Sequence, residues 1–187
     1  MRQDPNIILV GEIRDRETAD LAIQASLTGH LVFSTLHTNN ASGALPRLLD
    51  MGAEPYLLTS SMTAIVAQRV ARKIHEDCKE EYDADPKIIT EMKEVLGPLW
   101  PADNKGKMYK GKGCDACGNT GYYGRVGIFE VLPVTDAVGR MILERKPAVD
   151  IEKKAKDEGM ITLKQDGYLK VLSGETTIEE ILRVAQE

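Results

Sequence analysis

Residues 7–15, Ile-Ile-Leu-Val-Gly-Glu-Ile-Arg-Asp, place a run of apolar residues directly before an acidic side chain. Four β-forming residues without polar alternation predict a strand that is buried on both faces, as in a parallel sheet covered by helices. Glu12 follows this strand, at the end where open α/β sheets bind their ligands. A carboxylate there can orient a water molecule or contact a magnesium ion, as on the Walker B strand of a nucleotide hydrolase. The alternative is a buried strand followed by a surface charge.

The composition is that of an ordinary soluble globular protein. The 187 residues are 42% hydrophobic and 28% charged, which is enough for one large or two small domains. We find no apolar run near the roughly 18 residues that span a bilayer, and no secretory signal. The net charge of -5 gives no overall attraction to nucleic acid or to an anionic membrane. The three cysteines fit metal binding in a reducing compartment better than a disulfide framework, so a cytoplasmic protein is expected.

The first 73 residues alternate between helix and strand patterns. After the first strand, the expected elements are a helix over 16–28 with Asp15 as N-cap, a second buried strand over 30–36, a helix from Asn39 or Asn40 to Gly52, and a long helix from Pro55 to about Ile74. This alternation predicts an α/β fold in which crossovers join parallel strands.

The character of the sequence changes near His75. The expected elements are then an acidic stretch over 75–85, a helix over 86–96, a Gly/Lys-rich loop over 104–113, a strand over 122–132, and helices over 135–146, 148–158, 162–173 and 177–186. Thr177 and Glu180 have the spacing of a capping box for the last helix. We expect three parts, namely a core over 1–73, a metal-binding module over 74–125, and a strand with a helical segment over 126–187.

Two neighbouring strands of the predicted sheet end in polar residues. Glu12 follows the first strand and His37 follows the second, and the carboxyl ends of parallel strands meet at one edge. Converging groups of this kind suit phosphate chemistry, with Glu12 polarising an attacking water and His37 contacting the terminal phosphate. His30 begins its strand, so we expect it at the opposite end or in the approaching turn. A hydrogen-bonded structural role is the alternative for either histidine.

Several long motifs resemble one family. The stretch Arg2-Gln-Asp-Pro-Asn-Ile-Ile-Leu-Val-Gly-Glu-Ile-Arg-Asp15, with Glu17-Thr-Ala19 and Thr28-Gly-His-Leu-Val-Phe-Ser-Thr-Leu-His-Thr-Asn39, resembles the secretion ATPases, the hexameric motors of type II secretion and type IV pilus assembly. Residues up to Glu12 match the family's atypical Walker B motif, and residues 30–37 match its His box. The resemblance implies a RecA-like P-loop ATPase core that binds ATP and Mg²⁺. It assigns catalysis to Glu12 and His37, and nucleotide contacts to Gly11, Arg14, Asp15 and His30.

The resemblance also implies a larger assembly. The sequence contains no G-x-x-x-x-G-K-S/T loop, which in the resembling family lies upstream. We therefore expect the C-terminal portion of a larger motor, unable to hydrolyse ATP at a useful rate alone. The implied partners are the other subunits of a homohexamer, an inner-membrane platform protein and a cytoplasmic membrane-associated adaptor, at the cytoplasmic periphery of the inner membrane, with no nucleic acid. Whether the machine serves type II secretion, type IV pili or DNA uptake stays open.

Two residue pairs of equal spacing predict a metal site. Cys114-x-x-Cys117, followed by a glycine turn, is typical of a zinc knuckle, and His75-x-x-Cys78 has the same spacing. Together they predict a tetrahedral Cys3His zinc site that is closed, and therefore structural rather than catalytic. The assembly and secretion branch of the resembling family carries four cysteines here, so the histidine is the ligand most in question.

Two alternatives to this zinc site stay open. In the first, His75 is exposed and the metal has fewer protein ligands or is absent. In the second, the two cysteines of Cys114-x-x-Cys117 form a redox pair.

The alternative to the motor function is a zinc ribbon that binds protein or nucleic acid. The acidic balance of the chain and its 5% aromatic residues disfavour nucleic acid, and only the basic segment Lys105–Lys112 fits phosphate contacts.

Overall fold

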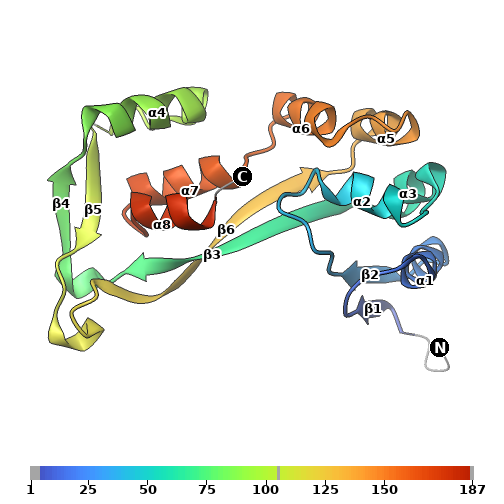
Figure 1. The fold of residues 1–187 in the computed structure, drawn as a ribbon, viewed down its shortest axis with the longest axis horizontal. Helices are drawn as coiled ribbons and strands as arrows, with labels where there is room; N and C mark the ends of the chain where they lie inside the picture. Colours follow the sequence, from blue (N-terminus) through green and yellow to red (C-terminus); the bar gives the residue numbers. More distant parts are fainter. Residues whose placement is uncertain (1–4, 105, 186–187) are drawn as a thin grey trace. The chain divides into compact units, whose positions relative to one another are not determined.

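A computed structural model describes residues 5–104 and 106–185, which form a mixed α/β protein (Figure 1). Residues 2–4 of the quoted motif, residue 105 of the Lys-rich loop and residue 186 of the last predicted helix lie outside the described residues. None of the helices within the described ranges is long and apolar enough to cross a membrane.

The chain forms two compact units, and each unit is built from two stretches of sequence. Unit 1 comprises the residues up to Ala67 together with Val131–Met160, and unit 2 comprises Gln68–Glu130 together with the residues from Ile161 onward. The three-part division predicted from the sequence stays a prediction, because compactness alone does not show which parts fold independently.

Unit 1 begins with a strand-helix-strand crossover, as predicted. Its elements are β1 (Ile7–Val10), α1 (Arg16–Leu27), β2 (Leu31–Ser34), α2 (Ala44–Asp50), α3 (Pro55–Ser61), the start of β3 (Ala64–Ile74), the end of β6 (Tyr122–Pro133), α5 (Asp136–Leu143) and α6 (Ala148–Asp157). β1 and β2 are parallel, and the register pairs Ile7 with Leu31 and Val10 with Ser34. The helix α1 connects them and packs on β2 and α3 (Figure 1).

The prediction that β1 and β2 are buried on both faces is wrong for this chain. Leu9 is 77% exposed and Phe33 is 53% exposed. Within residues 5–104 and 106–185, the two strands make a two-stranded sheet. One crossover helix cannot bury both faces of a two-stranded sheet. Apolar runs of this kind are typical of strands in a wider sheet whose two faces are both covered.

The prediction of a long helix from Pro55 to Ile74 is also wrong. α3 ends at Ser61, and β3 follows as a strand that pairs with β6. The buried residues Ala67, Ala71 and Ile74 are spaced by four and three, as on one face of a helix, which makes the pattern ambiguous. Residues between them alternate in exposure as in a strand. Pairing with β6, far along the chain, decides between the two structures.

The helix predicted over 39–52 begins later, at Ala44. Pro46 lacks a backbone N–H and is tolerated only in the first turn of a helix, so the helix cannot start much earlier. Asn40 shapes the preceding turn instead, because its Oδ1 accepts a hydrogen bond from the N–H of Gly43 at 3.0 Å.

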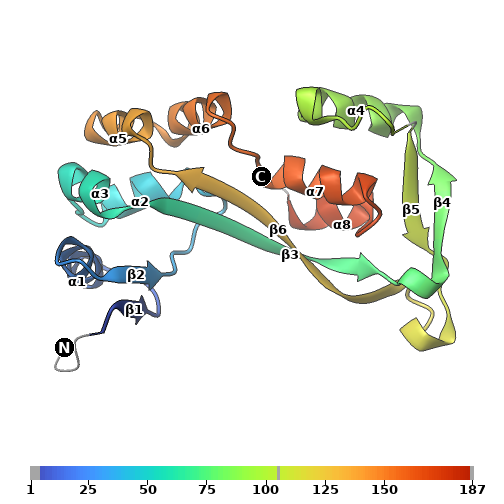
Figure 2. The same cartoon turned by 180° about the vertical axis from the view of Figure 1, so that it is seen from behind.

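Unit 2 combines a strand pair with helices. Its elements, besides the rest of β3 and β6, are η1 (Glu76–Cys78), β4 (Lys79–Asp83), α4 (Pro86–Leu96), η2 (Gly97–Leu99), β5 (Lys107–Gly111), η3 (Asp115–Cys117), α7 (Leu163–Leu172) and α8 (Ile178–Val184). Figure 1 and Figure 2 both show α7 and α8 side by side, and α7 also contacts α4 and β5. The core of this unit includes the buried residues Met92, Leu96, Met108, Tyr168 and Ile181.

The Gly/Lys-rich segment predicted as a loop over 104–113 contains the strand β5, antiparallel to β4. Opposite charges face each other across this ladder. Lys107 Nζ lies 2.9 Å from Asp83, and Lys110 Nζ lies 3.2 Å from Glu80. Such exposed cross-strand pairs contribute at most about 1 kcal/mol each. The acidic stretch over 75–85 and the Gly/Lys-rich segment over 104–113 therefore contribute neighbouring strands of complementary charge.

The capping box predicted for α8 is half formed. Thr177 Oγ1 accepts a hydrogen bond from the Glu180 N–H at 3.4 Å, but the Glu180 carboxylate accepts from the backbone N–H of Arg72 at 2.8 Å. It also pairs with the guanidinium groups of Arg72 and Arg183, at 2.7 Å each. Burial alone would raise the pKa of Glu180, but the two arginines lower it to about 2. This carboxylate ties α8 to β3.

We expect Glu180→Gln to lower the free energy of unfolding at pH 7 by on the order of 2 kcal/mol. Because the folded pKa of about 2 lies below the ordinary 4.5, the carboxylate stabilises the protein above pH 4.5, and this contribution is lost as the pH falls toward 2. Urea unfolding at several pH values measures the effect. The matched control is Glu179→Gln on the exposed neighbour, and equal stability losses for the two variants would contradict the assignment.

Candidate active site and metal centre

Glu12 and His37 meet at the carboxyl ends of β1 and β2. His37 Nε2 lies 2.7 Å from Glu12 Oε1. The two chain segments stay paired beyond the strands, because the Ile13 N–H donates to Thr35 O at 2.9 Å and Thr35 Oγ1 donates to Gly11 O at 2.7 Å. The structure thus brings together the two residues that the sequence predicts to converge, and their catalytic roles stay predictions.

Arg14 is the second partner of Glu12. Its Nη2 lies 2.6 Å from Glu12 Oε2. The hydrogen bond from Arg14 lowers the pKa of Glu12 below its ordinary value, and His37 adds to the effect. Glu12 is therefore an anion at neutral pH, the form that accepts a proton or binds a cation. Its side chain is 19% exposed, whereas those of Arg14 and His37 are 75% and 88% exposed, so both partners are open to a ligand.

Asp15 and His30 make local structural contacts. Asp15 caps α1, because its Oδ1 accepts from the Thr18 N–H at 2.8 Å, and this hydrogen bond lowers the pKa of Asp15. His30 lies before the amino end of β2, with Nδ1 3.0 Å from Ala25 O and 3.1 Å from Thr28 Oγ1. This is the opposite end of the strand from His37, as predicted, so the structure does not bring His30 to Glu12. The cofactor roles of these residues stay predictions.

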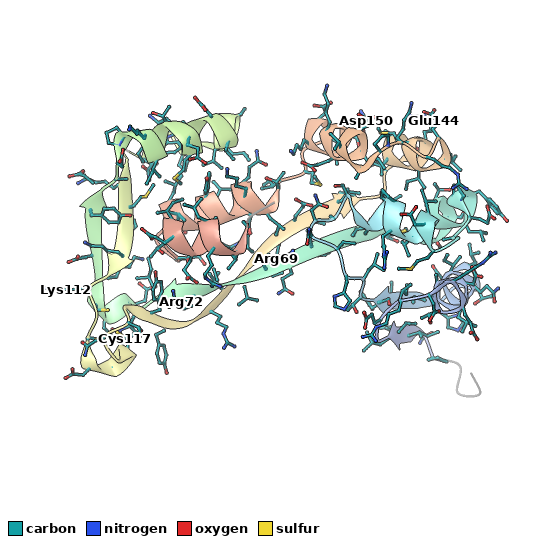
Figure 3. All side chains as sticks on the ribbon, in the orientation of Figure 1. Arg69, Arg72, Lys112, Cys117, Glu144 and Asp150 are labelled. Atoms are coloured by element: carbon teal, nitrogen blue, oxygen red, sulfur yellow. The ribbon has the colours of Figure 1, made fainter. Side chains whose placement is uncertain are left out.

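His75, Cys78, Cys114 and Cys117 form one cluster in unit 2, and Figure 3 labels Cys117 there. Their ligand atoms all lie within 4.8 Å of one another. Cys114 Sγ is 3.3 Å from His75 Nδ1 and 3.7 Å from Cys117 Sγ, which is 4.0 Å from Cys78 Sγ. A tetrahedral zinc ion with Zn–S bonds near 2.3 Å holds its sulfurs about 3.8 Å apart. The donor set and its spacing therefore fit one tetrahedral ion, and His75, whose side chain is 11% exposed, lies within the cluster.

Backbone amides and glycines shape the turn around the second cysteine pair. Cys117 Sγ accepts hydrogen bonds from the N–H groups of Cys114 and Gly121, at 3.2 and 3.3 Å. Burial alone would raise the pKa of Cys117, but these hydrogen bonds lower it to about 6, which favours the thiolate that binds metal. Burial raises the pKa of Cys78. A Cβ added at Gly111 would lie 2.0 Å from Gly121 O, so the close approach of these two segments requires glycine.

Two residues beside the His75, Cys78, Cys114 and Cys117 cluster were not singled out from the sequence. Asp77 Oδ2 lies 3.6 Å from His75 Nε2, and the Tyr123 ring centroid lies 5.5 Å from that of His75. An acidic residue two positions after a predicted histidine ligand is the signal that would have found Asp77, since ligating histidines commonly contact a carboxylate.

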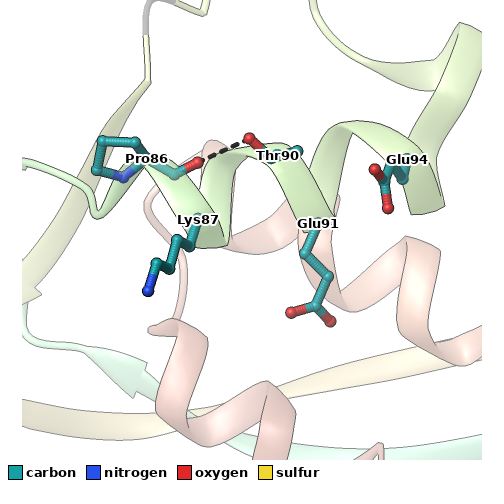
Figure 4. Close-up of a pocket in the computed structure, with 5 residues that line it drawn as sticks. All are labelled: Pro86, Lys87, Thr90, Glu91 and Glu94. Atoms are coloured by element: carbon teal, nitrogen blue, oxygen red, sulfur yellow. Dashed lines mark hydrogen bonds between the residues drawn. The ribbon is translucent and has the colours of Figure 1, made fainter.

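A shallow hollow lies along α4 (Figure 4) and contains none of the predicted site residues. Its lining residues all come from this helix, and they are Pro86, Lys87, Thr90, Glu91 and Glu94. Glu91 Oε1 accepts hydrogen bonds from Lys164 Nζ at 3.1 Å and from the Tyr168 hydroxyl at 3.0 Å. These contacts join α4 to α7, so the Glu91 carboxylate has a structural role.

Comparison with known proteins identifies the family. A model described as "Type II/IV secretion system protein" matches residues 1–183. The chain belongs to this family. The type IV pilus assembly ATPase PilB of Thermus thermophilus is 47% identical over 183 residues, which are 97% of this chain and 20% of that protein. Type II secretion system protein E of Pseudomonas aeruginosa is 46% identical over 189 residues, covering 100% of this chain and 36% of that protein.

Solved structures show the same fold as this secretion family chain. The crystal structure of the pilus retraction motor PilT with bound ADP matches with a TM-score of 0.62 and 26% identity, over 97% of this chain and 40% of PilT. The ATPase DotB of Yersinia pseudotuberculosis matches in fold, with a TM-score of 0.64 and 22% identity, over 98% of this chain and 38% of DotB. The chain thus spans between 20% and 40% of the length of these four proteins. The resemblance inferred from the motifs is confirmed.

Removing metal from the cluster is expected to unfold residues 75 to about 121 and to leave the β1–β2 pair folded. A structural zinc ion supplies roughly 10–16 kcal/mol of apparent binding free energy in zinc-finger peptides, enough to hold a small module together. Amide hydrogen exchange with and without a strong chelator measures this, and Cys114→Ser should reproduce the effect of the chelator. Loss of protection throughout the chain, or unchanged protection over 75–121, would contradict the prediction.

Proposed function

We propose that this chain carries the catalytic carboxylate of an ATPase motor that drives type II secretion or type IV pilus assembly. The observation that carries the proposal is the 2.7 Å contact between Glu12 and His37 at the carboxyl ends of two parallel strands. This is the edge where open α/β sheets bind ligands. Membership of the secretion family supports the proposal, as do relatives that are named ATPases or bind ADP.

In this proposal Glu12 polarises the attacking water and His37 contacts the terminal phosphate, with Arg14 in support. An anionic carboxylate is the form that accepts a proton from water. Both partners of Glu12 carry N–H groups, and phosphate oxygens accept hydrogen bonds, so the same exposed side chains suit a bound phosphate. Mg²⁺ bound with the nucleotide would neutralise charge on the phosphates.

ATP binding also requires a phosphate-binding loop, and the G-x-x-x-x-G-K-S/T motif does not occur in this sequence. We propose a RecA-like P-loop ATPase, assembled as a homohexamer, in which the edge with Glu12 and His37 faces such a loop. The exposed apolar side chains of Leu9 and Phe33 suit further strands of that core. The motor would work in the cytoplasm at the periphery of the inner membrane, on a membrane platform protein and a membrane-associated adaptor.

We further propose that His75, Cys78, Cys114 and Cys117 hold a structural Zn²⁺ ion. The spacing of their ligand atoms supports this assignment. Four protein ligands leave no open position for water or substrate, so the ion would stabilise unit 2 rather than take part in hydrolysis.

The chain of 187 residues alone is expected to release no phosphate from ATP above the buffer rate, because it lacks the phosphate-binding loop. A steady-state phosphate assay with ATP and Mg²⁺ tests this. Glu12→Gln serves as the control for contaminating enzymes. Hydrolysis by the chain that disappears in this variant would contradict the expectation.

In the assembled motor, Glu12→Gln should keep nucleotide binding and lower turnover by at least about 100-fold, the usual size of a general-base contribution. His37→Ala should lower turnover by about 10-fold or more, because it removes one phosphate contact. Phosphate release measures turnover, and the binding of a fluorescent nucleotide measures nucleotide affinity separately. Glu17→Gln, on an exposed residue of α1, is the matched control. Turnover like that of the unmodified motor would overturn the role of the residue concerned.

A further inference from the structure

The imidazole of His75 has two distinct environments. Its Nδ1 faces the cysteine cluster, 3.3 Å from Cys114 Sγ. Its Nε2 lies 3.6 Å from the Asp77 carboxylate, which is within ion-pair reach and slightly beyond hydrogen-bond length. The two ring nitrogens therefore point to different partners, and Nδ1 is the one that is directed at the metal ligands.

The ring is held in this orientation by its surroundings. The backbone N–H of His75 donates to Gly121 O at 3.0 Å, and the preceding residue, Ile74, is 1% exposed. The Tyr123 ring packs against the imidazole, with ring centroids 5.5 Å apart and ring planes inclined by 57°. Anchoring of the backbone and packing of the ring limit rotation of the side chain.

The turn η1 presents two acids, and only one of them faces the imidazole. The Glu76 carboxylate lies 3.4 Å from Lys73 Nζ and 3.5 Å from Lys79 Nζ. Asp77, two residues after the histidine in the same 3-10 turn, reaches back to Nε2. The lysines thus hold Glu76 elsewhere and leave Asp77 beside the ring.

A neutral imidazole carries a proton on one nitrogen and a lone pair on the other, and a metal needs the lone pair. A carboxylate that accepts from Nε2–H fixes the proton there and leaves the lone pair on Nδ1. Ligating histidines commonly have such a carboxylate partner, and its loss typically weakens metal binding by about 10- to 100-fold.

We propose that His75 binds the metal through Nδ1 and that Asp77 is a positioning residue that holds the imidazole in this tautomer. The inference rests on the zinc site proposed above. It gives the site three thiolates and one neutral imidazole, with a net charge of about −1 when Zn²⁺ is bound. Among the four ligands only the histidine has two tautomers, so only the histidine needs a partner that fixes the position of its proton.

Zinc affinity of the full chain, measured by competition with a chromogenic chelator, tests the role of Asp77. Asp77→Ala should bind zinc about 10-fold more weakly, and Asp77→Asn, which keeps an acceptor oxygen, should lose less. Asp115→Asn is the matched control, because Asp115 is exposed and lies between Cys114 and Cys117. A loss in Asp77→Ala that is no larger than the loss in Asp115→Asn overturns the proposal.

The tautomer is measured on the unmodified zinc-loaded chain by long-range ¹H–¹⁵N NMR of the histidine ring. We expect a metal-bound Nδ1 and a protonated Nε2, and a metal-bound Nε2 overturns the proposal. This measurement needs no variant, so a folding defect in Asp77→Ala leaves the test intact. A chain that takes up no zinc at all refutes the proposed metal site itself, whereas zinc uptake with the other tautomer refutes only the inference about Asp77.

His75→Cys offers a further check with Co²⁺ in place of zinc. A fourth thiolate should raise the thiolate-to-cobalt absorption by about one third, since its intensity follows the number of bound sulfurs. In that variant the effect of Asp77→Ala on metal affinity should disappear. If Asp77→Ala weakens the binding of both forms equally, Asp77 acts through its charge and the positioning role is wrong.

Discussion

The parallel pairing of β1 with β2 is the constraint on which the candidate active site depends. The register pairs Val10 with Ser34, and hydrogen bonds made by Thr35 continue the pairing past the strand ends. Glu12 and His37 therefore leave the sheet at the same edge. A slip of one residue would turn one of these side chains to the other face and separate them. The geometry of the candidate site thus follows from backbone pairing, with the helix α1 as the crossover that allows the strands to be parallel.

The cluster of His75, Cys78, Cys114 and Cys117 brings two segments of unit 2 together. These residues come from the turn between β3 and β4 and from the turn between β5 and β6, which are far apart in sequence. The ion pairs across β4 and β5 are exposed and contribute little. The buried carboxylate of Glu180 and the candidate zinc ligands are stronger restraints, because each joins several backbone segments at once.

Local signals predicted much of the fold and of both sites. Three of these signals depend on short stretches of chain, and the structure agrees with each of them. They are the apolar run before Glu12, which forms a strand, the N-cap Asp15, and the equal spacing within the two pairs of candidate ligands. Predictions failed for two segments whose secondary structure is decided by a strand elsewhere in the chain. β3 has buried residues at helical spacing and is a strand because of β6, and β5 is recognisable only beside β4. The exposure of Leu9 could not be predicted either, since a sequence pattern does not show which neighbours are present.

The proposed roles of Glu12 and His37 are tested most directly by an experimental structure of the assembled motor with a non-hydrolysable ATP analogue. We expect the Glu12 carboxylate and the His37 imidazole on the same side of the sheet edge, both within hydrogen-bond reach of the terminal phosphate or its attacking water. A structure in which either side chain points away from the nucleotide, or is engaged in packing elsewhere, would contradict these roles.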